Sequence, residues 1–545
     1  MKKFPAGAIL LFLFTLAFVF GLSQFSEYES AQSLVSALLS GSLTQGHSIN
    51  VLYFASHFLL ADFYGWLYNN IPGIPWYEGF MFGYIALSLF AILSLLWYAG
   101  KNLPLCMRAL FIAVTLLVST EFLLYMESTR TAFMLGTAST LLLFSSLQGK
   151  RDVRISLLLF IICLLTRPEV GIFILLFQWL ALAFYSSKKT AIRFLLLHTL
   201  ATTLVMGYIT YDRLTTTDYI KQFEPELGYQ LLDRGNIVPL SSMANQVDSA
   251  RYVAVQNMIM DSAYVSIDFL RSLVGNDPYT GISSELVGRC LNIFAESVDK
   301  AFGLIVIYAA VLMLLAWHTF KQNRKRALLW LAYQLVFWLV IIITIYTIKM
   351  EVWVFSSAII MMILIMLIQI PSVMQKNIPG ILITVALIGY GTFKLFKHQY
   401  EYSQMLVTER YTSAMFTDKL KQKAAGKIIL PGIDQALYLT HSVRPYKLPD
   451  YKAFKRIYLL DSDMLHLEKN YKEYLKQECN CNAGDYMAVW DFVANQKNNS
   501  YIVMDSLRLS QIVNYSSVVR GRNYQLTAID SIKTDNFNSV IYKFE

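Results

Sequence analysis

Apolar stretches and short polar connectors alternate along the first 396 residues of the chain. Most of the apolar stretches contain at least about 17 residues, the length at which a helix begins to cross the hydrocarbon core of a bilayer. The pattern therefore predicts about eleven transmembrane helices. They are expected at residues 5–22, 79–98, 105–124, 131–147, 155–166, 171–185, 194–210, 301–320, 327–346, 352–370 and 378–396.

Three apolar segments fit a full membrane span less well. Residues 155–166 and 171–185 are short, so a re-entrant hairpin is an alternative to two spans. Residues 49–67 are apolar but include His57 and Asp62. Because a carboxylate inside the bilayer costs about 3 kcal/mol on insertion scales, we interpret residues 49–67 as a segment at the membrane interface.

Lys and Arg residues are concentrated in alternate connectors, beginning with Lys2 and Lys3 before the first apolar stretch. Basic connectors stay in the cytoplasm by the positive-inside rule, so we expect a cytoplasmic N-terminus. Four parts of the chain then lie on the opposite side, where aqueous chemistry is expected. They are residues 23–78, the short turn at residues 121–130, residues 211–300 and the tail at residues 397–545.

Composition agrees with a membrane protein, because 56% of the 545 residues are hydrophobic and 15% are charged. In a soluble protein, the net charge of +9 would suggest a nucleic-acid partner. Here the basic residues lie in connectors, where they set topology and meet anionic headgroups. The expected partners therefore include membrane lipids and exclude nucleic acid.

The tail has the pattern of a small α/β domain. It is more polar than the preceding residues and contains short runs rich in β-branched and aromatic residues. A helical pattern occupies residues 466–477. The predicted strands are residues 427–430, 456–460, 501–504, 524–529 and 540–544.

The first candidate site residues follow the first predicted span. Glu27 and Glu29 are two residues apart, and His47 lies further along the same loop. A carboxylate in a partly desolvated site can act as a general base toward an acceptor hydroxyl. The structural alternative is a solvated helix end at the membrane surface.

Aromatic residues and helix breakers occupy the end of the same loop, where Trp76 and Tyr77 follow Pro75. Trp and Tyr are enriched at membrane interfaces, so anchoring explains both residues. The alternative is a platform that stacks against a sugar ring, because an aromatic face offers apolar area to a pyranose.

A second acidic cluster lies between the third and fourth predicted spans and comprises Glu121, Glu127 and Arg130. Glu127 and Arg130 are three residues apart, so they could pair on a helix. Alternatively, a second carboxylate would orient an acceptor or hold a metal ion beside the first-loop acid.

Charged residues also occupy two outer turns. Arg167 and Glu169 flank Pro168, and Lys349 and Glu351 lie between two later spans. An Arg this close to hydrocarbon is costly unless it is paired or binds a ligand. Its guanidinium suits phosphate oxygens. Arg167 and Lys349 could therefore neutralise a lipid phosphate. The alternative is that Arg167 pairs with Glu169 or Glu127, and that Lys349 pairs with Glu351.

The layout resembles the GT-C superfamily of membrane glycosyltransferases, which use polyprenyl-phosphate-linked sugars. It shares a first span, a large outer loop with acids, a multi-span bundle and an α/β tail. In sequence, the resemblance is carried by residues 40–46, residues 68–77 and residues 167–169, which look like stretches of bacterial relatives.

The resemblance implies that Glu27 or Glu29 is the catalytic base and that Glu127 or Glu121 is a second acid. Many members have Asp at the first position, where this chain has Glu27. The remaining residues expected to contact substrate are Arg130, Arg167, Glu169, Lys349, Glu351, His47, Trp76 and Tyr77.

We therefore expect an α-helical polytopic membrane protein with a GT-C-like domain at residues 1–396 and an extracytoplasmic α/β domain at residues 397–545. It would lie in a bacterial inner membrane. It would transfer a sugar from a polyprenyl-phosphate-linked donor to a glycan, lipid or protein acceptor.

Two other functions and one cofactor question stay open at this point. A polymerase or ligase of lipid-linked oligosaccharides would share the topology. A transporter or non-catalytic assembly protein would instead favour charges at mid-membrane or broken helices. A divalent cation is left open as a cofactor.

Overall fold

The computed structural model describes most of the helical region and part of the tail. The described residues are 6–28, 58–71, 73–146, 153–181, 188–215, 227, 231, 237–257, 259, 261–275, 284–347, 351–373, 378–424, 426–430, 457–460, 475–476, 480, 485–496, 499–534 and 537–545.

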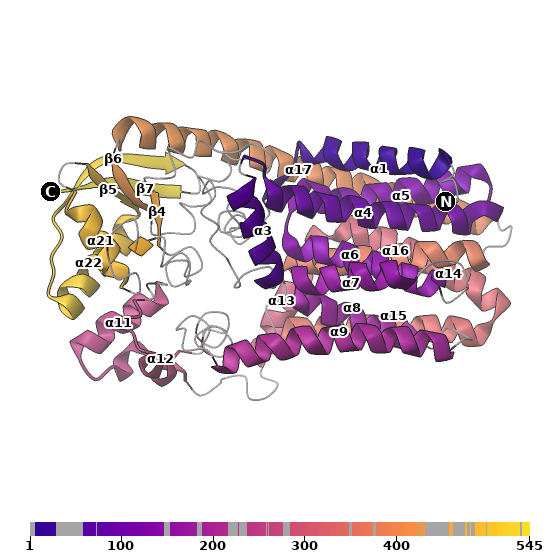
Figure 1. The fold of residues 1–545 in the computed structure, drawn as a ribbon, viewed down its shortest axis with the longest axis horizontal. Helices are drawn as coiled ribbons and strands as arrows, with labels where there is room; N and C mark the ends of the chain where they lie inside the picture. The colour runs from indigo at the N-terminus through magenta and orange to yellow at the C-terminus, as the bar shows by residue number, and fades with distance from the viewer. Residues whose placement is uncertain are drawn as a thin grey trace.

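Within these residues, a helix lies over each of the predicted apolar stretches, and the helices run side by side along the long axis (Figure 1). Six of the described helices are long and apolar enough to cross a membrane. The chain is therefore a helical membrane protein. The bundle helices are α1 (Ala6–Ser23), α4 (Trp76–Ala99), α5 (Leu105–Leu124), α6 (Ser128–Ser146), α7 (Val153–Thr166), α8 (Pro168–Ala181), α9 (Lys188–Thr215), α14 (Phe302–Gln322), α15 (Arg324–Thr347), α16 (Val352–Val373) and α17 (Ile378–Lys423).

Burial differs strongly between the bundle helices. In α16, 78% of the most apolar stretch is buried, whereas in α9 the share is 17%. Leu200 and Leu204 of α9 and Leu335 of α15 are more than half exposed. Side chains of this kind are stable when lipid covers them, so α9 and α15 lie at the edge of the bundle and α16 lies in its core.

Helices α14 and α17 approach each other closely where two glycines meet. A Cβ atom added to Gly391 would lie 2.8 Å from the carbonyl oxygen of Gly303. Small residues allow helix backbones to pack this tightly in membranes. The apolar run of α17 ends near Phe396, but the helix continues to Lys423. The boundary expected after residue 396 therefore lies inside a continuous helix.

Helix α17 leads into a five-stranded mixed sheet. The strand order is β4-β3-β5-β7-β6, in which β3 is parallel to β4 and β5, and β7 is antiparallel to β5 and β6. We call residues 427–544 the sheet unit. Its elements are β3 (Lys427–Leu430), β4 (Ile457–Leu459), α21 (Tyr486–Ala494), β5 (Ser500–Met504), α22 (Ser506–Arg520), β6 (Leu526–Thr534) and β7 (Phe537–Phe544).

Each of these strands overlaps a predicted strand, because β-branched and aromatic runs favour extended backbone. All five residues of β5 are buried, as expected for a strand paired on both sides. Most of the helical pattern predicted at residues 466–477 lies outside the described residues.

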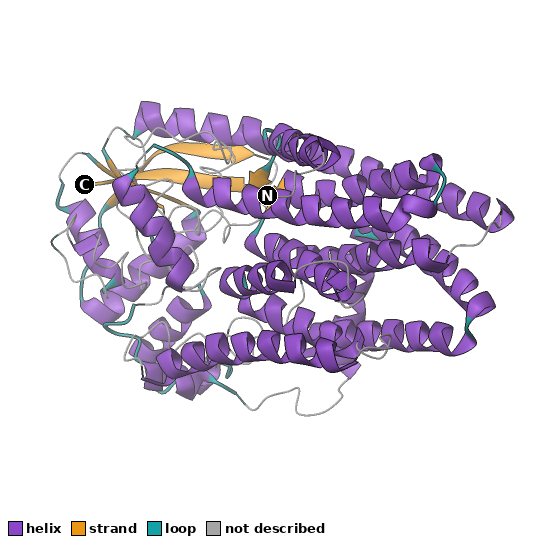
Figure 2. Cartoon of the chain, turned by 45° about the vertical axis from the view of Figure 1, so that its right-hand side comes forward, coloured by secondary structure: helices purple, strands orange, loops and turns teal. Residues whose placement is uncertain are grey.

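The sheet unit and several shorter elements gather at one end of the bundle (Figures 1 and 2). The C-terminal ends of α4 and α14 lie at the other end of the bundle, where Lys101 follows α4 and Lys321 lies in the last turn of α14. The shorter elements are β1 (Glu27–Tyr28), α3 (Phe58–Asn70), β2 (Tyr125–Met126), α11 (Gln246–Gln256), α12 (Ile267–Leu273) and α13 (Ser284–Lys300).

Helix α3 is inclined to the bundle helices and contacts α4 and α7 (Figure 1). It covers the second half of the segment interpreted as interfacial, and residues 49–57 lie outside the described residues. A tilted helix at the end of a bundle has the geometry of an interfacial helix.

Candidate functional site

A cavity of about 560 Å³ lies at the end of the bundle that carries the sheet unit. Seven elements contribute to its walls: the end of α5, β2, the start of α6, the end of α13, the starts of α14 and α16, and the middle of α17. We call it the end cavity. It is lined by Glu121, Tyr125, Arg130, Ile293, Glu296, Ser297, Lys300, Ala301, Leu304, Glu351, Val352, Trp353, Ser356, Leu395, His398, Glu401 and Tyr402.

Strand β2 links the first loop to the wall of this cavity. The chain between α5 and α6 is extended at Tyr125 and Met126, and it pairs in parallel with β1. The register places the backbone of Glu27 opposite Tyr125, which is itself a lining residue. The backbone of Glu27 and the segment between the third and fourth predicted spans, which carries Glu121 and Glu127, therefore share one corner of the molecule.

Glu121 and Arg130 form a buried ion pair in the cavity wall. Their exposed fractions are 6% and 4%, and Arg130 Nη1 lies 3.4 Å from Glu121 Oε2. The same nitrogen donates to the Glu121 carbonyl oxygen at 2.7 Å. Gln399 of α17 donates to Glu121 Oε1 at 2.9 Å. Several hydrogen bonds thus compensate the desolvation of the pair.

Aromatic contacts fix the same corner. The Arg130 guanidinium lies 5.2 Å from the centre of the Tyr125 ring. Tyr125 also meets Tyr402 of α17 edge to face, with ring centres 4.8 Å apart. Because Gln399 and Tyr402 both contact this corner, α17 is held against the junction of α5 and α6.

Glu127 has a different position from Glu121. Its carboxylate accepts hydrogen bonds from the backbone N–H groups of Thr129 and Arg130, and the Ser128 hydroxyl donates to it at 3.3 Å. A carboxylate that receives the first N–H groups of a helix is an N-terminal cap. Glu127 therefore caps α6 and does not line the end cavity, while Arg130 pairs with Glu121.

The turn between α7 and α8 lies beside the same cap. Arg167 Nε donates to the Thr129 hydroxyl at 3.2 Å. Glu169 is exposed in the first turn of α8. Neither residue lines the end cavity, whereas Glu351, before α16, does. Glu29, His47 and Lys349 lie outside the described residues.

Trp76 and Tyr77 lie in an aromatic cluster between α3 and α4. Trp76 Nε1 donates to the carbonyl oxygen of Ile71 at 2.9 Å. The Tyr77 ring is buried and meets Tyr64 edge to face at 5.7 Å. The Tyr77 backbone N–H donates to the Tyr68 hydroxyl at 2.9 Å. Both residues pack α3 on α4 and lie outside the cavity lining.

Several lining residues were missed in the sequence. Glu296, Ser297 and Lys300 belong to α13, and His398 and Tyr402 belong to α17. The signal for the α17 residues is their spacing after the last apolar run, because residues 395, 398 and 402 share one helix face. The signal in α13 is its separation of apolar and polar faces.

Carboxylates outnumber cations in the cavity lining. Glu121, Glu296, Glu351 and Glu401 face the cations Arg130 and Lys300 and the imidazole of His398. Lys300 pairs with Glu296 at 2.7 Å, and Lys397 outside the lining pairs with Glu401 at 3.6 Å. Both of these pairs are largely exposed, so each stabilises the fold by less than about 1 kcal/mol.

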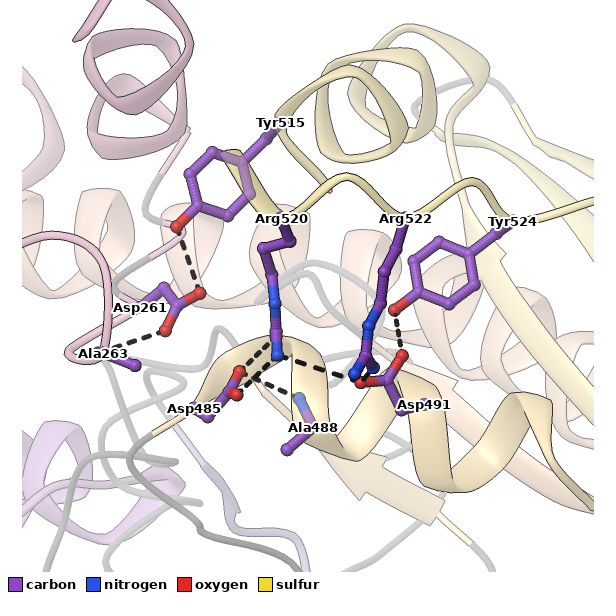
Figure 3. Close-up of polar contacts among 9 residues, drawn as sticks. All are labelled: Asp261, Ala263, Asp485, Ala488, Asp491, Tyr515, Arg520, Arg522 and Tyr524. Carbon is purple, nitrogen blue, oxygen red and sulfur yellow. Dashed lines mark hydrogen bonds and ion pairs between the residues drawn. The ribbon is translucent and has the colours of Figure 1, made fainter. Parts of the chain in front are cut away.

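A second polar cluster joins the segment around α11 and α12 to the sheet unit (Figure 3). Asp261 is fully buried and accepts hydrogen bonds from the Tyr515 hydroxyl at 3.1 Å and from the Ala263 backbone N–H at 3.2 Å. Burial, and then the nearby Asp485 carboxylate, raise the pKa of Asp261 to about 6.

Arg520 lies at the centre of this second cluster. It donates to both Asp485 oxygens, one of them at 2.6 Å, and lies 3.9 Å from Asp491. The Tyr524 hydroxyl donates to Asp491 at 2.7 Å. The Asp485 carboxylate also accepts the Ala488 backbone N–H, which caps α21. Internal bonds thus engage these side chains, and the cluster joins two parts of the fold.

Comparisons with known proteins add no family assignment. The chain matches no protein-family model, no curated protein and no solved structure. Among the residues that the structure describes, no group of three or more His, Cys, Asp and Glu side chains is arranged to hold a metal ion.

Proposed function

We propose that the protein is a membrane glycosyltransferase of the GT-C type and that its active site is the end cavity. It would transfer a sugar from a polyprenyl-phosphate-linked donor to an acceptor hydroxyl. The observation that carries the proposal is the pairing of β1 with β2, which brings the backbone of Glu27 beside the cavity wall.

The chemistry of the lining supports a carbohydrate ligand. Carboxylates accept hydrogen bonds from sugar hydroxyls, and aromatic rings such as Trp353 and Tyr402 offer apolar faces to a sugar ring. A volume of about 560 Å³ lies within the usual range for small-molecule sites. The neighbouring lipid-facing helices would keep the donor's chain in the bilayer.

The proposed reaction is a displacement at the anomeric carbon. Glu27 takes the proton of the acceptor hydroxyl, and the oxygen attacks the anomeric carbon. The bond from that carbon to the phosphate oxygen breaks, and its electron pair leaves with the phosphate. Positively charged groups stabilise this anion as it forms. From the sequence, Arg167 and Lys349 are candidates for that role.

The proposal includes an orientation. The end cavity and the sheet unit would face the extracytoplasmic side of a bacterial inner membrane, eleven helices would span the bilayer, and the basic connectors would face the cytoplasm. The end cavity and the sheet unit lie at the same end of the bundle, which supports this arrangement. A lipid-linked donor on the extracytoplasmic side needs no nucleotide.

Sugar transfer by the purified protein tests the proposal. With labelled polyprenyl-phosphate hexose and pentose donors, we expect product from the wild-type chain. Glu27→Gln should reduce kcat by about 100-fold or more, the usual share of a general base. The matched control is Asp268→Asn, an exposed carboxylate of α12, which should leave turnover unchanged.

Two outcomes would count against the proposal at different levels. Unchanged turnover in Glu27→Gln would remove Glu27 as the base while leaving the reaction in place. Absence of transfer by wild-type protein that does bind the donor would contradict the function itself and would favour a transporter or assembly protein.

A further inference from the structure

The departing phosphate needs a positive partner inside the end cavity. Four carboxylates line the cavity and would repel a phosphate that approaches unaided. Arg130 is engaged with Glu121, and Lys300 is engaged with Glu296. Both lining cations thus already neutralise carboxylates.

Of the two cations expected from the sequence, Arg167 is described, and it does not supply this partner. Arg167 bonds Thr129 beside the cap of α6 and is absent from the lining. Lys349 lies outside the described residues. A phosphate bound among the described lining residues therefore needs a third donor.

His398 has the position that such a donor requires. It lies on α17 between Leu395 and Tyr402, is partly buried, and lines the end cavity. It makes no hydrogen bond or ion pair with any described residue. The neighbouring Gln399 is committed to Glu121, and Tyr402 is packed against Tyr125. The imidazole is thus held in the wall with its polar atoms available to a ligand.

We propose that His398 binds the phosphate of the lipid-linked donor through its protonated imidazole. This inference rests on the proposed function and names a phosphate-binding residue for its donor. When the bond between the anomeric carbon and the phosphate oxygen breaks, the electron pair stays on that oxygen, and the imidazolium N–H stabilises the charge. The acceptor proton goes to Glu27, so His398 keeps its own proton.

A role as cation fits the cavity better than a role as base. Carboxylates able to accept a proton are in excess around His398, whereas donors not already paired with a carboxylate are scarce. The charged groups that share the cavity with His398 come from every wall: Glu121 of α5, Arg130 of α6, Glu296 and Lys300 of α13, Glu351 before α16, and Glu401 of α17.

Three variants of the full-length chain test the assignment. His398→Ala removes the cation, His398→Lys keeps a positive charge, and Tyr400→Ala is a control at an exposed position of α17 outside the lining. Two quantities are measured: affinity for polyprenyl monophosphate, which requires no turnover, and kcat and KM for the donor.

We expect His398→Ala to weaken polyprenyl monophosphate binding and donor kcat/KM by about 10- to 100-fold, the usual effect of losing a charge-assisted hydrogen bond. His398→Lys should retain both within about tenfold, because the point charge remains. Tyr400→Ala should match wild type.

Failure of this inference can be separated from failure of the function. If wild-type protein transfers sugar and His398→Ala binds polyprenyl monophosphate normally, the assignment of His398 is wrong and the function stands. Equal losses in His398→Ala and His398→Lys would also overturn it, because the residue would then be structural. If wild-type protein binds polyprenyl monophosphate but transfers no sugar, the proposed transfer reaction is wrong. The comparison of polyprenyl monophosphate binding between wild type and His398→Ala then still decides the assignment of His398.

Discussion

At the scale of single residues, buried charges in this chain are held by several bonds each. Glu121 is engaged by Arg130 and Gln399, and Asp485 receives Arg520 together with the N-terminus of α21. Asp261 differs, because its bonded neighbours are a hydroxyl and a backbone N–H, and another carboxylate lies nearby. A buried carboxylate in that setting favours its neutral form.

Asp261→Asn should therefore stabilise the protein at neutral pH. Because the folded-state pKa is raised to about 6 from an ordinary value near 4, the stability from this group is full below about pH 4 and lost as pH rises to 6. This pKa shift corresponds to a loss of at most about 3 kcal/mol in the free energy of unfolding at pH 7. Thermal unfolding of the purified chain between pH 4 and 8 measures the effect.

In that experiment, the variant should lose the pH dependence of the wild type between pH 4 and 6. Asp268→Asn, an exposed carboxylate in α12, serves as control and should leave the profile unchanged. Destabilisation by Asp261→Asn that increases as pH rises from 4 to 8 would contradict this account, because the carboxylate would then stabilise the fold in its charged form.

At the scale of helices, α17 connects three parts of the molecule. It packs on α14 at the Gly391 contact, contributes one wall of the end cavity, and donates from Lys419 to the carbonyl oxygen of Ser531 in β6 at 2.9 Å. A continuous helix of 46 residues transmits position along its length. The packing of α17 against α14 therefore sets the position of His398 in the cavity wall.

Replacing Gly391 with Val should separate α14 from α17. The added side chain would meet the backbone oxygen of Gly303, which cannot rotate away, so we expect a loss of about 1–3 kcal/mol in stability. Gly389→Val is the matched control, because a Cβ there meets nothing within 4 Å and helix propensity changes equally. Equal unfolding temperatures for the two variants would contradict the packing account.

The sequence predicts helices and strands better than it predicts which distant side chains contact one another. Apolar runs locate the bundle helices, and β-branched runs locate the strands, because both signals arise locally. The extension of α17 beyond Phe396 is missed when hydropathy is taken to mark the end of a helix. His398 is missed because its proposed binding role depends on which carboxylates, distant in the sequence, line the same cavity.

The acidic residues illustrate the same limit. Glu121 and Glu127 look alike in sequence, yet the extended residues Tyr125 and Met126 turn one toward the cavity and leave the other as a helix cap. A spacing of three residues suggests that Arg130 pairs with Glu127. Because the chain is extended at β2, Arg130 instead forms its ion pair with Glu121.

At the scale of the whole molecule, the elements proposed to form the active site gather at one end of the bundle. Helix α3, the end cavity and the sheet unit lie there. At the other end, Lys101 follows α4 and Lys321 lies in the last turn of α14. Under the proposed function, a lipid-linked donor would reach the cavity from the bilayer, and a water-soluble acceptor would reach it from the side of the sheet unit. The proposed function requires that this end face away from the cytoplasm.

Cysteine labelling in intact cells measures this orientation most directly. In a chain without its native cysteines, Asn523→Cys places a thiol on the exposed surface of the sheet unit, and Asn323→Cys places one between α14 and α15. A membrane-impermeant maleimide should label Asn523→Cys in intact cells and Asn323→Cys after the membrane is opened. Protection of Asn523→Cys together with labelling of Asn323→Cys in intact cells would contradict the account.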